Sequence, residues 1–333
     1  HSAKVDVAAY DAYLRGRYEL NQFLIEAPEK AIACFEDAIT RDPEFALPYA
    51  GMAEAYTLQS IGFAVSLSRE TMPKAKVNAE KALNLDPGLA EAHLARALVA
   101  MYYDWDYPCA RRGFDEALSL NPNYAGAHMW NEFYWTYTQR DYDKGLAACE
   151  RALQLDPLRL DLLDRRGTIH LLFGYFDLAI EQFQSMLEMQ PGYAMAYLGL
   201  ADTYCRMGNL DASVDAAENA VELGGRALAM VAILAFVYAL AGKEAKAREI
   251  MAELQDRSRQ GYISSFWLAN VHAALNEHDT AFDLLERARE ERDGSMIYLT
   301  FLPGCLGLHV HPRFEALAKS IGLGHLLPIE NPT

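Results

Sequence analysis

Long apolar runs and a secretion signal are both missing from the chain. A membrane-spanning helix needs about 18 or more consecutive apolar residues, and the longest uncharged apolar run, residues 227–242, is shorter than that. The chain opens with His1 and Ser2, with neither an initiator methionine nor an apolar signal region. We interpret these two residues as a tag remnant in front of a fragment or a processed product. We therefore expect no membrane contact within this chain, and we leave open an upstream effector domain in a longer protein.

Basic residues are scarce relative to acidic ones. The 333 residues include 30 lysines and arginines against 46 aspartates and glutamates, for a formal net charge of −16. A phosphate backbone attracts clustered Lys and Arg, so this balance argues against direct binding of nucleic acid. It also argues against anionic membrane surfaces. A neutral or basic protein or peptide partner fits the charge better.

Cysteines are few and widely spaced, and no CxxC pair occurs. An odd number of scattered cysteines indicates free thiols rather than a disulfide framework, which favours a reducing compartment. We therefore expect a cytoplasmic protein, with the periplasmic side of a membrane-anchored protein as the alternative. The five cysteines are Cys34, Cys109, Cys149, Cys205 and Cys305.

The motifs of the common enzyme classes are absent as well. The chain has no GxxxxGKS/T, no GxSxG and no HExxH. Asp161 precedes Arg165 by one helical turn, which predicts a solvated ion pair rather than a catalytic carboxylate. His309 and His311, with Cys305 nearby, are the best metal candidates, but no further Cys or His array joins them. We therefore expect no catalytic residue, no cofactor and no metal site, and hence a protein that is not an enzyme.

What the sequence does contain is an internal repeat. Segments such as CFEDAITRDP and NAEKALNLDP recur, and each ends at a proline, which stops a helix because it lacks an amide donor. A second recurring run, such as AEAHLARALVA, follows each proline, so one unit comprises two amphipathic helices and two turns. The prolines are Pro43, Pro87, Pro122, Pro157 and Pro191, at intervals of 44, 35, 35 and 34 residues.

Small side chains recur at three positions of each unit, where two closely packed helices need them. Larger aromatic residues such as Phe35 and Phe183 then fill the interface between the helices. On the first helix the small residues are Ala53, Ala97, Gly167, Ala201, Ala235 and Ala269. On the second helix they are Ala31, Ala75, Ala110, Ala179, Ala247 and Ala281. A third set, which lets the next hairpin dock, comprises Ala38, Ala82, Ala117, Ala152, Ala220 and Ala288.

These positions resemble the tetratricopeptide repeat (TPR) family, whose unit of about 34 residues carries small, aromatic and proline positions of this kind. The resemblance implies an all-α fold: a right-handed TPR superhelical solenoid of about eight helix-turn-helix repeats with a C-terminal capping helix. The implied array covers residues 6–293, with insertions near 24–28 and 58–72. Residues 294–333 would form the cap and tail. Glu132 departs from the pattern, because it stands at a position that is usually small.

In this family the first helices line a concave face, and the resemblance implies that their non-core positions contact a partner. Repeats three and four are unusually aromatic there, which predicts an apolar binding patch. The alternative is that a tightly wound superhelix buries those side chains within itself. The implied groove residues are Glu54, Leu98, Met101, Tyr102, Met129, Phe133, Tyr137, Asp164, Thr168, Asp202, Arg206 and Phe236.

We therefore expect a non-catalytic protein–protein interaction scaffold that binds a peptide or protein segment in its concave groove. The array also resembles the C-terminal TPR regions of bacterial signalling proteins, in which such repeats follow a nucleotide cyclase, a winged-helix DNA-binding domain or a protein kinase. The alternative function is therefore a ligand- or peptide-sensing regulatory module of a larger bacterial signalling protein. Its effector domain, a transcriptional regulator or a nucleotide cyclase, would lie outside this chain.

Overall fold

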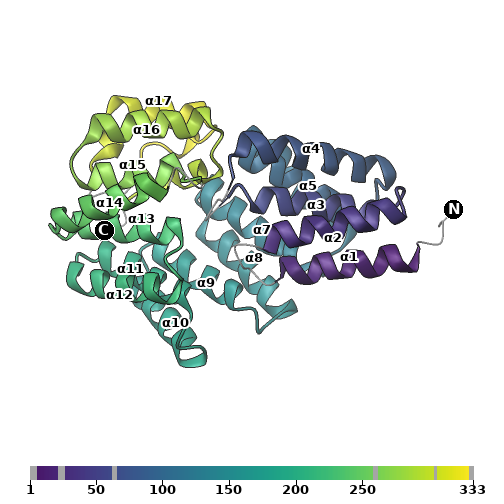
Figure 1. Ribbon diagram of the computed structural model, residues 1–333, viewed down its shortest axis with the longest axis horizontal. Coiled ribbons are helices and arrows are strands. Elements are labelled where there is room, and N and C mark those ends of the chain that lie inside the picture. The colour runs from purple at the N-terminus through teal and green to yellow at the C-terminus, as the bar shows by residue number, and fades with distance from the viewer. Residues whose placement is uncertain (1–5, 22–26, 62–65, 258–261, 304–305, 330–333) are drawn as a thin grey trace. The chain divides into compact units, whose positions relative to one another are not determined.

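Helices joined by tight turns make up the protein (Figure 1). The computed structural model describes residues 6–21, 27–61, 66–257, 262–303 and 306–329. No β-strand occurs in these ranges, and none of their helices is both long and apolar enough to cross a membrane. The predicted tag remnant, Cys305 and parts of the two predicted insertions lie outside the described residues.

The chain divides into two compact units. Unit 1 comprises His1–Trp130 together with Glu291–Gly294, and unit 2 comprises Asn131–Glu290 together with Ser295–Thr333. Each unit has buried clusters of its own, one of them around Phe35 in unit 1 and another around Ala235 in unit 2. These units do not test the predicted division into a repeat array (residues 6–293) and a cap with tail (residues 294–333). That division stays a prediction.

Within the described residues the α-helices form eight consecutive hairpins, which confirms the predicted number of repeats. The hairpins are α1 (Val7–Leu20) with α2 (Ala27–Arg41), α3 (Ala46–Leu58) with α4 (Ser68–Leu85), α5 (Ala90–Val99) with α6 (Tyr107–Leu120), α7 (Ala125–Phe133) with α8 (Tyr142–Leu155), α9 (Leu160–Leu172) with α10 (Phe176–Met189), α11 (Ala194–Arg206) with α12 (Leu210–Leu223), α13 (Leu228–Leu240) with α14 (Glu244–Arg257), and α15 (Ser265–Ala274) with α16 (His278–Glu290). The π-helical segments η1 (Ala100–Asp104) and η2 (Tyr134–Thr138) extend α5 and α7. The 3₁₀ segments η3 (Gly294–Phe301), η5 (Leu308–Val310) and η6 (Gly324–Leu326) flank α17 (Pro312–Ser320), the predicted capping helix.

The predicted small positions are all buried, which confirms the packing inferred from the repeat. Phe183 of α10 shows the reason, because its ring lies between Gly167 of α9 and Gly199 of α11. A Cβ atom added at Gly199 would lie 2.3 Å from the Phe183 ring, and one added at Gly167 would lie 2.7 Å from it. The ring therefore touches the backbones of two first helices, and a side chain at either glycine would push them apart.

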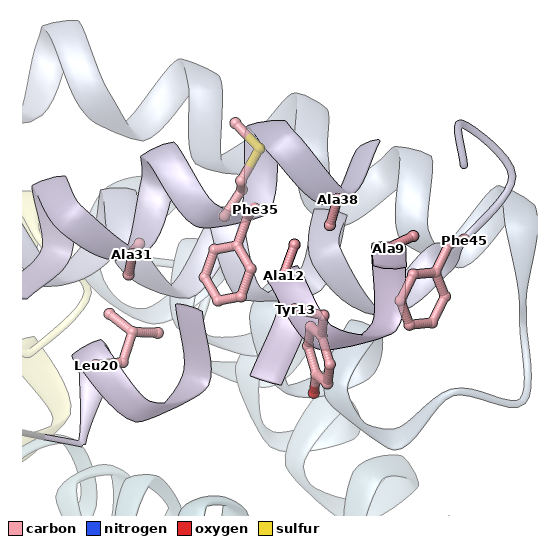
Figure 2. Close-up of a cluster of buried hydrophobic side chains, with 10 residues drawn as sticks. Ala9, Ala12, Tyr13, Leu20, Ala31, Phe35, Ala38 and Phe45 are labelled. Carbon is pink, nitrogen blue, oxygen red and sulfur yellow. The ribbon is translucent and has the colours of Figure 1, made fainter. Parts of the chain in front are cut away.

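Phe35 repeats this arrangement in unit 1, where Figure 2 shows it among buried apolar side chains such as Tyr13 and Ala31. The side chain is fully buried, and Cβ atoms added at Gly16 and Gly51 would lie 2.5 Å and 2.6 Å from its ring. Tyr13 packs beside it, with 5.9 Å between the ring centroids. Each of these hairpins thus docks by inserting a ring of its second helix where two first helices lack side chains.

In the six hairpins from α5/α6 to α15/α16, the turn inside the hairpin closes on a residue with left-handed backbone. In the later hairpins this residue is glycine or asparagine, the types that adopt positive φ most easily. In hairpins α5/α6 and α7/α8 it is instead Trp105 (φ 54°) and Arg140 (φ 53°), a conformation that costs a larger residue about 1 kcal/mol or more. The corresponding residues of the later hairpins are Gly174, Gly208, Gly242 and Asn276.

Hairpins α5/α6 and α7/α8 also carry one additional residue, which explains the intervals of 35 rather than 34 residues between their prolines. The additional residue is accommodated in η1 and η2, because a π-helical turn takes in one more residue than an α-helical turn. The hydrogen bond that closes the turn therefore spans one residue more. The Asp141 N–H donates to the Trp135 carbonyl at 3.0 Å, whereas in α9/α10 the Tyr175 N–H donates to the His170 carbonyl at 2.9 Å.

Replacing Gly199 by alanine should destabilise unit 2, although alanine favours a helix over glycine by about 1 kcal/mol. The added Cβ would overlap the Phe183 ring, and overpacking a filled core costs about 1–3 kcal/mol. Since the helical gain offsets part of this cost, we expect Gly199→Ala to lower the free energy of unfolding, measured by urea denaturation, by up to about 2 kcal/mol. Gly192→Ala is the matched control, because nothing lies within 4 Å of a Cβ at that position. An equal change in the free energy of unfolding for the two variants would contradict the packing role of Gly199.

Candidate functional site

The first helices of unit 2 share one face, which we call the inner face. It is the surface formed by η2, α9, α11, α13 and α15. Helix α9 contacts α11, α11 contacts α13, and α13 contacts α15. The end of α7 reaches α9 through an ion pair between Glu132 and Arg165, and η2 reaches it through the hydrogen bond that Arg165 donates to Tyr137. The repeat therefore places equivalent positions of successive hairpins side by side.

The inner face of unit 2 holds a segment of the same chain, residues 295–302. The Phe301 ring centroid lies 5.6 Å from that of Tyr137 and 5.8 Å from that of Phe173. The Tyr298 ring lies 4.7 Å from Tyr137 and 6.2 Å from Trp267 of α15. The first three of these contacts are edge-on and the one with Trp267 is tilted, and edge-on aromatic contacts at such distances are favourable beyond the apolar area that they bury. The segment is therefore anchored by two aromatic side chains that lie three residues apart.

Two arginines bind the main chain of this segment. Arg140 Nη1 donates to the Thr300 carbonyl oxygen at 3.1 Å, and Arg206 Nη2 donates to the Phe301 carbonyl oxygen at 2.9 Å. The Arg140 guanidinium also lies over the Phe301 ring, 4.6 Å from its centroid. Asp202 accepts from Arg206 Nε at 2.9 Å and so orients that guanidinium. Because the acceptors are backbone carbonyls, this part of the site does not depend on side-chain identity.

A buried charge network lies beside the aromatic anchors. Arg165 donates from Nε to Glu132 Oε2 at 2.9 Å and from Nη2 to Oε1 at 2.8 Å, a two-point contact in which the Glu132 side chain is only 1% exposed. Arg165 also donates to the Tyr137 hydroxyl at 3.2 Å, and the Thr136 hydroxyl donates to Glu132 at 2.8 Å. Glu132 is therefore tolerated at a normally small position because it is fully paired there.

The ion pair predicted between Asp161 and Arg165 is wrong. Arg159 holds Asp161 instead, with Nε to Oδ1 at 3.0 Å, and Arg165 turns to Glu132 of the preceding hairpin. The reason is that Glu132 is more deeply buried than Asp161. A buried carboxylate without a cation is strongly destabilising, so Glu132 requires Arg165, whereas Asp161 is 19% exposed and pairs locally.

Asp164 of α9 is a half-buried carboxylate to which no described residue donates a hydrogen bond. Burial raises the pKa of Asp164 to about 7, Asp161 and Glu132 contribute to the rise, and the charge of Arg165 opposes it. The side chain therefore changes its charge near neutral pH. It lies on the inner face without a hydrogen-bonding counterpart in the described part of the chain.

The predicted site residues of unit 1 are held by internal packing. Leu98, Met101 and Tyr102 are at most 1% exposed, and Tyr102 packs edge-on against Trp130 with 5.9 Å between the ring centroids. Glu54 forms an ion pair with Arg17 that ties α3 to α1.

The groove residues predicted from the sequence therefore fall into two classes. The buried ones match the alternative in which the repeat array covers its own aromatic side chains, and the partly exposed ones remain accessible to a partner. The buried residues are Leu98, Met101, Tyr102, Met129 and Tyr137. The partly exposed residues are Glu54, Phe133, Asp164, Thr168, Asp202, Arg206 and Phe236. Their role in binding stays a prediction.

Sequence reasoning missed two contributors to the inner face. Arg140 follows η2 rather than lying on a first helix, and Phe301 belongs to the segment that departs from the repeat. Two features of the sequence could have indicated these residues. One is an arginine in the turn where later hairpins have Gly174 and its equivalents, and the other is the apolar run MIYLTFLP outside the repeat pattern.

The histidines singled out near the C-terminus have structural contacts. His311 stacks on Phe282 with 4.4 Å between the ring centroids, and its Nδ1 accepts from the Arg313 N–H at the start of α17. Burial and the charges of Arg140 and Arg206 lower the pKa of His309, so it stays neutral at physiological pH. Among the described residues, which exclude Cys305, no group of three or more His, Cys, Asp or Glu side chains could hold a metal ion.

Arg165→Leu should destabilise unit 2 by about 3–5 kcal/mol, because it leaves Glu132 buried without a cation. Replacing both Arg165 and Glu132 by leucine should restore much of the lost stability, which a double-mutant cycle in urea denaturation would measure. Arg248→Leu is the control. Its ion pairs are exposed, and such pairs contribute about 1 kcal/mol or less. A double variant less stable than Arg165→Leu alone would contradict the account.

Asp164→Asn should stabilise the protein at alkaline pH and leave it unchanged in acid. The pKa is raised in the folded chain above the unfolded value of about 4, so the native state binds more protons between about pH 4 and pH 7 and stability falls as pH rises through that range. We expect the free energy of unfolding of the variant to exceed that of the parent by about 1–3 kcal/mol at pH 8, and the two values to be equal near pH 4. Denaturation at both pH values tests this, and a pH-independent difference would contradict the raised pKa.

The family model described as anaphase-promoting complex subunit 5 matches residues 161–244 of this chain, which is less than half of its length. Among proteins of curated function, none matches the sequence.

Two solved structures resemble the fold over nearly the whole chain. IFIT1, as a monomeric mutant with Gppp-AAAA, has a TM-score of 0.61 at 18% identity and covers 94% of this chain and 71% of its own. Yeast Tom70 has a TM-score of 0.56 at 16% identity and covers 97% of this chain and 69% of its own. YrrB, described as a TPR protein with an unusual peptide-binding site, has a TM-score of 0.38 at 23% identity and covers 57% of this chain and 91% of its own. The hairpins, their buried alanine positions and the likeness to IFIT1 and Tom70 together show that this chain has the TPR-type all-α repeat fold.

Proposed function

We propose that this protein is a non-catalytic interaction scaffold that binds a basic protein segment on the inner face of unit 2. The TPR-type fold supports a protein-interaction role in general. The observation that carries the finer proposal is Asp164, a half-buried carboxylate of the inner face that receives no hydrogen bond from any described residue. A lysine or arginine of a partner would supply the missing donor and a favourable charge.

Other acidic residues of this face already have cations of their own. Asp164 therefore adds a negative charge beyond these pairs, and a partner that brings one basic group would balance it. The pairs are Glu132 with Arg165, Asp161 with Arg159, and Asp202 with Arg206.

Partly exposed aromatic side chains accompany this charge. Phe133 retains accessible surface and lies under the guanidinium of Arg165, the residue that follows Asp164, at 4.0 Å from the ring centroid. Phe236 also retains accessible surface, on α13 of the same face. Thr168, one helical turn after Asp164, adds a hydroxyl group. Aromatic surface next to a partly desolvated charge is the composition of energetically dominant interface residues, so the face fits a basic residue that is followed by an apolar one.

A peptide library displayed on phage and selected on the intact chain tests this proposal. We expect the selected peptides to carry Lys or Arg beside an apolar residue, and we expect Asp164→Asn to weaken their binding about tenfold, which corresponds to about 1.4 kcal/mol. Binding should also weaken below about pH 7, because protonation removes the charge of Asp164. Asp177→Asn on α10 is the control, because it changes the same charge on a second helix. Selection of acidic peptides, or equal binding by both variants, would overturn the proposal.

A further inference from the structure

We infer that residues 295–302 are a tethered ligand of the inner face of unit 2, seated in a site that also accepts a partner segment with two aromatic residues three positions apart. The inference rests on the proposed function, because it concerns access to the same face. It names a second recognition element, separate from the charge of Asp164.

The seating of the segment defines what this site recognises. The carbonyls of two consecutive residues, Thr300 and Phe301, accept hydrogen bonds from arginines of two different hairpins. A 3₁₀ helix has three residues per turn, so Tyr298 and Phe301 emerge on the same side of η3, and both rings contact Tyr137. The site thus combines donors for main-chain carbonyls with aromatic contacts for two side chains, which is a general way of binding a polypeptide.

The backbone of Arg140 supports a binding role for this residue. Arg140 has φ 53° at the turn position that Gly174, Gly208 and Gly242 occupy in later hairpins. Its side chain makes both the carbonyl contact and the cation–π contact with the segment. A residue kept in a strained conformation where glycine would serve is typical of binding sites. Trp105 has the same backbone at the equivalent turn of α5/α6, so the specific feature of Arg140 is the side chain that reaches the segment, which glycine would not provide.

The segment has the form of a bound ligand rather than that of a repeat helix. Its only regular structure is η3, and 3₁₀ hydrogen bonds have poorer geometry than those of an α-helix. Tyr298 keeps part of its surface exposed, whereas Met296, Ile297 and Leu299 are fully buried. Release of the segment therefore uncovers apolar surface, which a partner with a comparable apolar segment would cover again. A partner that carries the same aromatic pattern would compete against a tether whose effective concentration is about millimolar.

Competition in trans tests the inference directly. The probe is a dye-labelled peptide with the sequence of residues 293–303, and its binding to the intact chain is followed by fluorescence anisotropy. The variant Tyr298→Ser plus Phe301→Ser weakens the tethered ligand and leaves the face intact, so we expect it to bind the probe about tenfold more tightly than the parent chain. Adding Arg140→Gln and Arg206→Gln to that variant should remove the gain. A probe with serine at both aromatic positions should bind neither protein.

Each result decides for or against the tethered ligand. A folded Tyr298→Ser/Phe301→Ser variant that binds the probe no better than the parent chain would overturn it, and so would equal binding of the two probes. If that variant does not fold, native-state hydrogen exchange of the parent chain decides. Exchange of the amides of 296–302 before those of α9 and α11 supports release, and exchange only with global unfolding excludes it. Failure of basic peptides to bind would count against the proposed function alone, since this probe does not use Asp164.

Discussion

Contact between an aromatic ring and two glycine backbones is the interaction on which the rest of unit 2 depends. Phe183 of one hairpin touches α9 at Gly167 and α11 at Gly199, and neither position has room for a Cβ atom. The two first helices are thereby held close together and in a fixed register. That register also brings equivalent helix ends together, so that Arg140 after η2 and Arg206 at the end of α11 reach adjacent carbonyls of one segment.

A single additional residue distinguishes hairpin α7/α8 from the later hairpins that form the inner face. It converts the end of the first helix into η2, and insertions of this kind are frequent at functional sites. Tyr137 lies within η2 and contacts both aromatic anchors of the segment, while Arg140 follows directly in a left-handed conformation. Glu132, just before η2, is neutralised by Arg165 of the next hairpin. Local strain and a buried charge are thus both found where the chain binds its own C-terminal segment.

Periodicity made most of the fold predictable, because each alanine position of the repeat reports a contact between neighbouring helices. All of these positions are buried as expected, and α17 is the capping helix that the sequence predicted after the repeats. The site was less predictable for a physical reason. Arg140 and Thr300 are 160 positions apart, and a contact between a repeat and a segment outside it leaves no periodic signal. The ion pair of Arg165 was misassigned because its true partner, Glu132, lies one repeat away, where helical spacing gives no guidance.

The central claim is that the inner face of unit 2 holds residues 295–302 by the aromatic ring of Phe301. Photo-crosslinking measures this contact most directly, with benzoylphenylalanine in place of Phe301 and the products mapped by mass spectrometry. The account predicts crosslinks within one molecule to the peptides that contain Tyr137 or Phe173, whose rings lie nearest to Phe301. Crosslinks only to other parts of the chain, or only between molecules, would contradict it.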